Sequence, residues 1–433
     1  MIFRDKTSQL SYSEVLDYIL QMEKFGIKLG LSNITKFLSH LGNPHNTYPT
    51  VHVAGTNGKG STVAIMESIL AAAGYRVGVY TSPHLVDFRE RIRINGRFIE
   101  KKFITDFINK NLKKIESLPL TYFETVTALA FAYFRDEKVD AALIETGMGG
   151  RLDATNVIQP KVTVITNIAT EHTKWLGLKI REIAFEKAGI IKSGVPVISA
   201  AINLDARRVI RQVSEQNKCN IVSVFDETQW IIKDISRDTT ELDIFTRSNK
   251  YYNLRLALPG RHQLENAVSA LLAVEHLEEA TGIKASNTAV AAGFRSIKHE
   301  GRLQRVSEKP EIILDVAHNP AALSRIREYF HEFYEDKKII ALFGIVSDKD
   351  YAKMIKELDR IAEVIILARP MTDRAADPEM LAKEIAKSNT NYKVIPMVHE
   401  AYQAARDLCK PDDVILVTGS HYTVGEVLAG LKD

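Results

Sequence analysis

The chain has 433 residues, of which 45 % are hydrophobic and 26 % are charged, and this composition excludes a mostly disordered, collagen-like or coiled-coil protein. At roughly 100–200 residues per domain, the length predicts two or three domains. Lys and Arg total 57 against 54 Asp and Glu, so the net charge of +3 gives no field that would favour nucleic acid or an anionic membrane as the main partner.

The first part of the chain alternates short apolar runs with amphipathic stretches, which is typical of a parallel sheet wrapped by helices. We expect strands at 50–54, 76–81, 139–145, 161–168 and 195–199, with helices at 61–73 and 124–134 between them. Residues 220–258 alternate apolar and polar side chains and predict hairpins. A long amphipathic helix is expected at 261–279.

A second series of apolar runs follows at 311–317, 337–343, 363–368, 392–397 and 413–418. The polar segment 296–305 between the two series is the candidate linker. We therefore expect an α/β protein with two domains. Residues 1–295 would form a large domain with a mostly parallel sheet and a small β-rich extension, and residues 306–433 a second, Rossmann-like α/β domain.

Cysteine usage and the N-terminus bear on the compartment. The two cysteines, Cys219 and Cys409, are far apart and form neither a disulfide framework nor a C-x-x-C pair. The segment from Met1 to Lys6 lacks the apolar core of a signal peptide, and no run approaches the roughly 18 apolar residues of a membrane helix. We expect a cytoplasmic monomer whose partners are small molecules.

A glycine-rich turn after the first predicted strand gives the strongest chemical signal: Gly55-Thr56-Asn57-Gly58-Lys59-Gly60-Ser61-Thr62. Backbone N–H groups of such a turn close on phosphate oxygens, and the following helix adds its positive end. Lys59 adds a full charge, and Ser61 or Thr62 can reach phosphate or Mg²⁺. Because Gly60 separates Lys59 from Ser61, this is a variant of the common phosphate loop. The preceding strand and following helix argue against a plain exposed turn.

Three further polar residues follow predicted strands of the first series: Ser82, Glu145 and His172. Each by itself is compatible with a solvated residue at the end of a strand. The carboxyl ends of parallel strands lie at one edge of a sheet, which is where open α/β sheets bind ligands. We therefore expect these residues and the phosphate loop to share one site, with Glu145 placed to hold Mg²⁺.

Lys187 shares a predicted helical face with Ile180, Ile183 and Ala184. A lysine in an apolar stripe is unfavourable unless its side chain extends to solvent, pairs with an anion or is chemically modified. The spacing alone favours the extended side chain.

The second series also carries polar residues at strand ends. Asp315 could bind a ribose hydroxyl, and His318 could stack on a base or bind phosphate. Lys349, flanked by Asp348 and Asp350, is interpreted as part of a solvated charge cluster. We expect the edge of this domain to close over the edge of the first.

Taken together, these segments resemble the folylpolyglutamate synthase/dihydrofolate synthase family of the Mur ligase superfamily. The matching segments span almost the whole chain in family order: 28–31, 55–61, 80–85, 123–124, 145–156, 171–172, 187–190, 262–266, 301–303 and 315–319. The resemblance implies an ATPase domain that also binds folate, followed by a Rossmann-like ligase domain.

The resemblance also implies roles for individual residues. The ATP site would comprise Gly55, Thr56, Asn57, Gly58, Lys59, Gly60, Ser61, Thr62, Asn266, Arg302, Asp315 and His318. Mg²⁺ would be held by Ser61, Ser82, Glu145 and His172, with a carbamylated Lys187 helping to hold a second Mg²⁺. Lys59, His172, Lys187 and Arg302 would be the catalytic residues.

The substrate pocket implied by the resemblance contains Lys28, Leu29, Gly30, Thr121, Tyr122, Phe123, Leu152, Asp153 and Ala154. Asp153 would accept hydrogen bonds from a pterin ring, and Tyr122 with Phe123 would form an apolar wall. The sequence departs from the family at Glu171, where Asp is usual, and at His421, where an aliphatic residue is common. Neither departure is expected to touch the implied ligand-binding residues.

The resemblance implies an ATP-dependent amide ligase that adds L-glutamate to reduced folates, and to dihydropteroate as well, through an acyl phosphate. Another Mur-type ligase acting on a cell-wall precursor is the alternative enzyme, and residues 81–84 and 152–156 argue against it. A regulatory P-loop NTPase is the alternative from a different class.

Overall fold

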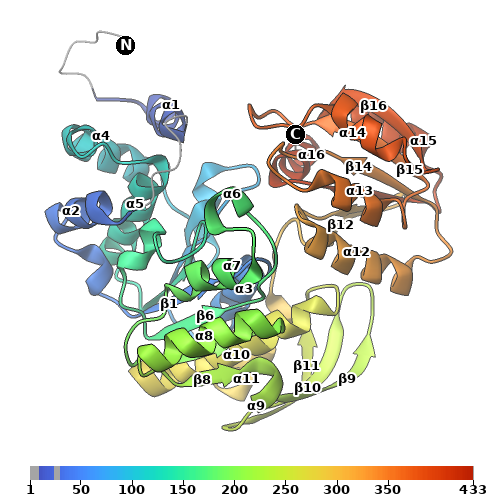
Figure 1. Ribbon diagram of the computed structural model, residues 1–433. Helices are drawn as coiled ribbons and strands as arrows, with labels where there is room; N and C mark the ends of the chain where they lie inside the picture. The colour runs from blue at the N-terminus through green and yellow to red at the C-terminus, as the bar shows by residue number, and fades with distance from the viewer. Residues whose placement is uncertain (1–8, 24–29, 433) are drawn as a thin grey trace.

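The computed structural model describes residues 9–23 and 30–432. Its strands form three sheets: a large one in the first part of the chain, a small antiparallel one beside it and a third in the C-terminal part. Figure 1 shows the C-terminal part, in orange and red, as a separate lobe above the small sheet.

The large sheet has the order β4-β3-β2-β5-β1-β6-β7-β8, and the strands from β2 to β8 in this order are parallel. Its strands are β1 (Thr50–Ala54), β2 (Val77–Tyr80), β3 (Ile92–Ile94), β4 (Arg97–Phe98), β5 (Ala141–Glu145), β6 (Val162–Ile165), β7 (Val197–Ser199) and β8 (Ile221–Ser223). Every residue of β1 and β5 is buried, as expected for central parallel strands covered on both faces.

Helices cover both faces of this sheet. One face packs on α3 (Lys59–Ala72), α10 (His262–Thr281) and α11 (Asn287–Ser296). The other packs on α1 (Tyr12–Glu23), α2 (Ser32–His40), α4 (Lys101–Ser117) and α5 (Tyr122–Asp136), and, further along, on α7 (Ile180–Ala188) and α8 (Leu204–Gln216). Short helical turns lie at η1 (Pro44–Asn46), η2 (Phe88–Arg91), η3 (Ala154–Val157), α6 (Thr173–Leu176) and α9 (Val224–Glu227).

The small sheet is an antiparallel meander of β9 (Gln229–Ile235), β10 (Thr240–Phe245) and β11 (Lys250–Leu256). Its apolar residues join the same core cluster as α3 and α10. The sequence predicted hairpins over the whole of 220–258, and this is wrong for the first residues, because β8 pairs in parallel with β7 at the edge of the large sheet. Three residues are too few to show a periodicity that separates the two arrangements.

The C-terminal sheet has the order β12-β13-β17-β14-β15-β16, in which only β12 is antiparallel to its neighbour. Its strands are β12 (Gln304–Glu308), β13 (Glu311–Leu314), β14 (Ile339–Phe343), β15 (Val364–Arg369), β16 (Asn391–Met397) and β17 (Val414–Thr418). The helices α12 (Pro320–Phe333), α13 (Tyr351–Leu358) and α14 (Pro378–Ile385) pack on one face, and α15 (Val398–Leu408) and α16 (His421–Lys432) on the other.

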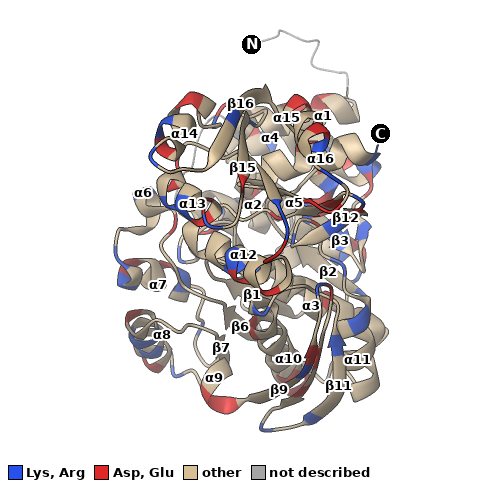
Figure 2. Ribbon diagram, turned by 90° about the vertical axis from the view of Figure 1, so that its right-hand side faces the viewer, with Lys and Arg blue, Asp and Glu red and all other residues tan. Residues whose placement is uncertain are grey.

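The predicted α/β class with two sheet-centred parts is confirmed. The division at 296–305 stays a prediction, although β12 begins at Gln304, inside the segment predicted as a linker. Lys and Arg are interspersed with Asp and Glu over the whole ribbon in Figure 2. Among the described residues, no helix has the length and apolar character needed to span a membrane.

Leu85 ties the two lobes together. It lies in the loop after β2, yet its side chain packs against the apolar cluster of β13, β14, β17 and α16 in the C-terminal lobe. Its carbonyl oxygen lies so close to Gly425 of α16 that a Cβ there would come within 2.2 Å of it. The first lobe therefore packs a leucine against the core of the second.

Candidate active site between the two lobes

The four polar segments predicted to share an edge follow four neighbouring strands. In the order β2-β5-β1-β6, Ser82 follows β2, Glu145 ends β5, the glycine-rich turn follows β1 and His172 lies beyond β6. These strands are parallel, so their carboxyl ends meet at one edge of the sheet. The candidate site is centred there.

The glycine-rich turn is held in shape by the segment after β6. The N–H groups of Thr56 and Asn57 donate to the main-chain and side-chain oxygens of Asn167, both at 2.8 Å. The hydroxyl of Thr166 donates to the carbonyl of Asn57 at 2.8 Å. The loop is therefore formed in advance of any ligand.

Two glycines of the turn are required by close neighbours. Gly58 has φ +88°, and a Cβ there would lie 2.2 Å from Oδ1 of Asn266 on α10. At Gly55, with φ +152°, a Cβ would meet the hydroxyl of Thr166 at 1.7 Å. Both positions combine a backbone conformation that disfavours side chains with a filled space. Asn266 therefore packs directly on the loop, as the predicted nucleotide site requires.

Helix α3 begins at Lys59 without a side-chain cap, so its first N–H groups and its positive end face the site. The ammonium of Lys59 donates to the carbonyls of Gly55 and Thr56, each at 3.2 Å, and lies 3.9 Å from Glu145. Ser61 is buried in the same first turn. This arrangement is suited to a polyphosphate.

Glu145 and Ser82 form the oxygen-rich side of the site. Ser82 N–H donates to Glu145 at 3.4 Å. Burial raises the pKa of Glu145, and the nearby charges of Lys59 and Arg302 oppose that shift. In the part of the chain that the structure describes, no three His, Cys, Asp or Glu side chains gather in a metal-ligating cluster. A site built from one carboxylate and hydroxyls suits Mg²⁺, which keeps several waters and shares phosphate oxygens.

Glu171 is paired with Lys187 inside the protein. The two side chains are 5 % and 1 % exposed, and Lys187 Nζ lies 2.6 Å from Glu171 Oε1 and 2.7 Å from the carbonyl of Gly55. Spacing favoured an extended, solvated lysine, and this is wrong, because the helix face that carries Lys187 points at the phosphate loop. The expectation that Glu171 touches no implied ligand residue is also wrong.

Lys349 reaches the site from the C-terminal lobe. Its ammonium lies 3.4 Å from Nε2 of His172, and Glu171 is one of the charges that act on it. Burial, and next the charge of Lys349, lower the pKa of His172 to about 4, so the imidazole is neutral at pH 7. The prediction of a solvated charge cluster is therefore wrong for Lys349 itself. It holds for its two neighbours, because Asp348 pairs with Arg374 and Asp350 with Lys353 at the surface.

Arg302 and Asp315 lie at the start and end of the β12–β13 hairpin. Asp315 accepts hydrogen bonds from the N–H groups of Leu303 and Ala317, both at 2.8 Å, which fixes the ends of this hairpin. The carboxylates of Asp315 and Glu145 both act on Arg302, whose pKa burial lowers. Arg302 is therefore within electrostatic reach of one acid from each lobe.

His318 and His421 lie side by side, with ring centroids 5.3 Å apart. Nδ1 of His318 lies 2.9 Å from the carbonyl of Val316, so this nitrogen carries the proton and donates. Burial lowers the pKa of His318 to about 3. The expectation that His421 touches none of the implied ligand residues is thus wrong.

The predicted substrate residues are brought together in part. Thr121 caps α5, and its hydroxyl exchanges hydrogen bonds with Glu124 at 2.9 and 3.2 Å. Arg91 lies 5.4 Å from the centre of the Tyr122 ring, and Phe123 lies against Gly147. Leu152 and Ala154 flank Asp153 in the loop after β5. Lys28 and Leu29 lie outside the described residues, and Gly30 follows them with φ +142°.

Asp153 is engaged within its own loop. One carboxylate oxygen accepts from the N–H groups of Gly147 and Met148 at 3.0 and 2.9 Å, and the other from the N–H and hydroxyl of Thr155 at 3.0 and 2.5 Å. A carboxylate has about four acceptor positions, so none is left for a ring. The predicted hydrogen bonds from a pterin to Asp153 do not fit this arrangement. Asp153 shapes the loop instead.

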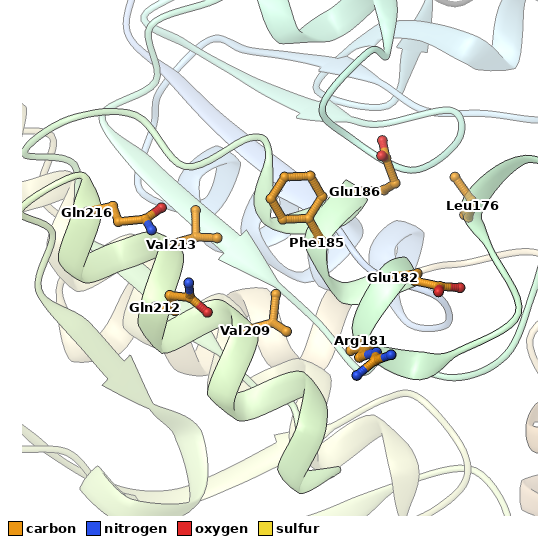
Figure 3. A pocket seen from close by; sticks show the side chains of 9 residues that line it. All are labelled: Leu176, Arg181, Glu182, Phe185, Glu186, Val209, Gln212, Val213 and Gln216. Atoms are coloured by element: carbon orange, nitrogen blue, oxygen red, sulfur yellow. The ribbon is translucent and has the colours of Figure 1, made fainter.

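A pocket of about 420 Å³ lies away from this site, between α7 and α8 (Figure 3). Its lining combines apolar side chains such as Phe185, Val209 and Val213 with Arg181 and Glu182. It lies on the side of α7 opposite to Lys187, and none of the predicted site residues lines it.

Comparison with known families gives the class of this protein. The family description "Mur ligase middle domain" matches residues 53–274, and "Mur ligase, glutamate ligase domain" matches residues 301–421. The two matches fall on the first lobe and the C-terminal lobe in that order, so the chain is a Mur ligase.

Individual relatives narrow this class. The chain is 35 % identical over 429 residues to the dihydrofolate synthase/folylpolyglutamate synthase of Bacillus subtilis (strain 168), covering 98 % of this chain and 99 % of that protein. It therefore belongs to the dihydrofolate synthase/folylpolyglutamate synthase family. The structure of E. coli FolC in complex with DHPP and ADP has a TM-score of 0.88 and 32 % identity, covering 98 % of this chain and 99 % of that one. A bifunctional folylpolyglutamate synthase/dihydrofolate synthase with Mn, AMPPNP and L-glutamate bound has a TM-score of 0.86 and 30 % identity, covering 98 % and 100 %.

Proposed function

We propose that this protein is an ATP-dependent ligase that joins the amino group of L-glutamate to the carboxylate of a folate, with release of ADP and phosphate. The observation that carries the proposal is the meeting of charges from both lobes at the phosphate loop. Lys59 and Glu145 belong to the first lobe, and Arg302 and Lys349 to the hairpin and the β14 edge of the second. Relatives bound to ADP and DHPP, and to AMPPNP and L-glutamate, support it.

The chemistry proceeds in two displacements. A carboxylate oxygen of the folate attacks the γ-phosphorus of ATP, the bond to ADP breaks, and an acyl phosphate forms. The amine of L-glutamate then attacks the acyl carbon, the carbon–oxygen bond to phosphate breaks, and the amine loses its proton as the amide forms. In the first step negative charge is spread over the transferring phosphoryl group and ADP, and in the second it builds on the acyl oxygen and the departing phosphate.

Residues of this chain offset that charge. The N–H groups of the loop and the start of α3 bind the phosphates, and Lys59 places its ammonium beside them. Arg302, which follows the first lobe and acts on Glu145, supplies a second cation. Because the acyl phosphate is hydrolysed by water, closure of the second lobe over the first protects it.

A divalent cation fits this donor set. Ser61, Ser82 and Glu145 would hold it, and His172 lies on the same edge with a neutral imidazole. When bound, the ion neutralises the charge of the β- and γ-phosphates. The buried hydroxyl of Ser61 and the half-buried Ser82 leave the carboxylate of Glu145 as the only charged donor of the three.

A carbamate on Lys187 and a second ion fit less well. Lys187 Nζ donates to Glu171 and to the carbonyl of Gly55, whereas a carbamylated nitrogen has a single N–H. Its carboxylate would also face that of Glu171, a like-charge contact that a cation would have to separate. No step is derived through this group. A ¹³C carbamate resonance from protein kept under ¹³CO₂ would establish it, and the absence of that resonance would rule it out.

The substrate class includes dihydropteroate as well as reduced folates in this proposal. The aromatic side chains Tyr122 and Phe123 beside the 147–155 loop support a flat ring as ligand. Amide formation from dihydropteroate, ATP and L-glutamate tests it. An enzyme that extends tetrahydrofolate but makes no dihydrofolate would limit the function to polyglutamylation.

One experiment tests the ligase itself. ADP release is measured with dihydropteroate, tetrahydrofolate or a cell-wall precursor, each with and without L-glutamate. A ligase releases ADP at full rate only with both substrates, whereas a nucleotide switch hydrolyses ATP with neither. With ¹⁸O in the substrate carboxylate, one label must appear in the released phosphate. Phosphate without label would exclude the acyl phosphate.

A further inference from the structure

The turn between β9 and β10 reaches across to the C-terminal lobe. It is a tight turn in which the N–H of Ser236 donates to the carbonyl of Thr239 at 2.9 Å, and the hydroxyl of Ser236 accepts from the N–H of Thr239 at 3.1 Å. Arg237 and Asp238, at its tip, point away from their own sheet. In Figure 1 the sheet that carries this turn lies directly below α12.

Arg237 is held by three groups of the second lobe. Its guanidinium lies 4.8 Å from the centre of the Tyr334 ring and 3.3 Å from Oε2 of Glu311. The hydroxyl of Tyr334 donates to Oε1 of the same glutamate at 2.5 Å, which closes a three-membered network. The hydroxyl of Tyr329 donates to the carbonyl of Arg237 at 2.9 Å. Main chain and side chain of one residue are thus both engaged.

Asp238 makes the second link, to Arg305 at 2.7 Å. Arg305 lies on β12 and Glu311 on β13, so the turn holds both strands of one hairpin. At the other end of that hairpin the N–H of Leu303, the residue after Arg302, donates to Asp315. The residues that the turn grips therefore belong to the element that presents the guanidinium to the phosphate site.

Helix α12 links the same two places. It begins after Asn319, whose side-chain amide exchanges hydrogen bonds with that of Asn57 in the phosphate loop at 2.8 and 3.2 Å. It ends next to Tyr334, in the network around Arg237. At 1.5 Å per residue the helix is about 20 Å long. A displacement of about 1 Å at its far end corresponds to a rotation of the lobe by about 3°.

We propose that Arg237 and Asp238 are positioning residues for the ligase reaction: the β9–β10 turn clamps the β12–β13 hairpin and α12, and so sets the orientation in which Arg302 and Asn319 meet the phosphate loop. The clamp then adds to the other contacts between the lobes, which include Leu85 against α16 and the ion pair of Arg261 with Glu332. Among them it is the contact that holds the β12–β13 hairpin itself. The catalytic part of this inference rests on the function proposed above.

The clamp is tested with Arg237→Ala, Asp238→Ala and the double variant. Hydrogen exchange of residues 301–319, measured without ligand, is expected to accelerate, because the hairpin and the start of α12 lose their remote support. The dissociation constant for AMPPNP is expected to rise about two- to fivefold for a single variant, and kcat/KM for ATP to fall by a similar factor. The first two readouts do not depend on the folate reaction.

Asp226→Ala is the matched control, because it removes a comparable surface ion pair, with Arg207, within the first lobe. It is expected to leave all three readouts unchanged. A double-mutant cycle of Asp238→Ala with Arg305→Ala sharpens the test, since a shared contact gives non-additive effects.

The clamp would be overturned if residues 301–319 of the Arg237→Ala/Asp238→Ala variant exchanged hydrogen at the wild-type rate. Additive effects of Asp238→Ala and Arg305→Ala in the double-mutant cycle would overturn it as well. If a variant loses thermal stability, Arg237→Lys decides the matter, because it keeps the charge near Glu311 and is expected to restore most of the affinity. If the wild type shows no ligase activity with folates, but hydrogen exchange and AMPPNP binding change as expected in the variants, only the proposed function is refuted and the clamp stands.

Discussion

The two lobes both gather polar residues at the carboxyl edge of a parallel sheet, but they build these edges differently. In the first lobe the phosphate loop is fixed by neighbouring backbone and side chains, and Glu145 ends a fully buried strand. In the second lobe the groups that face the site, Arg302 and Lys349, are long side chains on a hairpin and a loop. The geometry of the first edge is fixed within its own lobe, whereas the position of the second edge at the site depends on the orientation of the second lobe relative to the first.

Because of this difference, we expect the binding of nucleotide and the closure of the two lobes to respond to different substitutions. The first edge holds the phosphate loop by itself, so ADP should stay bound when a charge of the second edge is removed. The second edge adds positive charge only when the lobes are together, so it should act on the transfer step. Substitutions on the two sides are expected to have different kinetic signatures.

The largest effect is expected at Lys59, on the preformed edge. Lys59→Ala should lower kcat/KM about a thousandfold, because the phosphoryl group loses the cation fixed beside it. The melting temperature should stay unchanged, since Lys59 bonds only to loop carbonyls and lies 3.9 Å from Glu145. Steady-state kinetics and thermal unfolding measure both. Near-normal turnover would refute the phosphate-loop assignment.

The Glu171–Lys187 pair tests how rigid that edge is. Glu171→Gln leaves a buried ammonium without its anion and should lower the free energy of unfolding by about 3 kcal/mol. The double variant Glu171→Gln/Lys187→Met removes both charges and should recover part of that loss. Urea unfolding at pH 7 measures the difference. Equal stability of the single variant and the wild type would show that the pair does not support the loop.

A smaller effect is expected at Lys349, on the edge that depends on closure. Lys349→Ala should lower kcat by about ten- to a hundredfold and leave the dissociation constant for ADP unchanged. Lys353→Ala, four residues further along in an exposed pair with Asp350, is the matched control. Weaker ADP binding in Lys349→Ala would contradict the separation of the two edges.

The smallest expected effect is a pH dependence of the free energy of unfolding, which arises from buried histidines. Burial lowers the pKa of His52 to about 3 and of His262 to about 4, against 6.5 in the unfolded chain. Between about pH 6.5 and 4 the unfolded state binds protons that the folded state does not, so stability falls as the pH drops, by up to about 1.4 kcal/mol per pH unit for each histidine. Unfolding at pH 7 and pH 5 of the wild type and His52→Gln measures this slope. The slope should decrease in that variant and stay unchanged in His331→Gln, which alters an exposed residue.

The sequence predicted the first edge better than the second, for a physical reason. Gly55, Lys59 and Glu145 are adjacent to strands, and parallel pairing alone brings strand ends together. Lys349 was interpreted as solvated because two acids flank it, and only the approach of the lobes turns it inward. The contacts of Arg237 and of Asn57 with the second lobe depend equally on how the lobes meet, which no local pattern encodes. Asp153 was expected to face a ligand, and the fold of its own loop takes up its acceptors.

Leu85 has a consequence for how the chain could be divided. Its side chain packs against the C-terminal core, and its carbonyl lies so close to Gly425 that a side chain there would force a shift. A fragment ending before the second lobe would expose this leucine, and a fragment containing only the second lobe would expose the apolar surface that it covers. Two such halves produced in one cell would meet through this contact, and burial of the leucine would favour their reassembly.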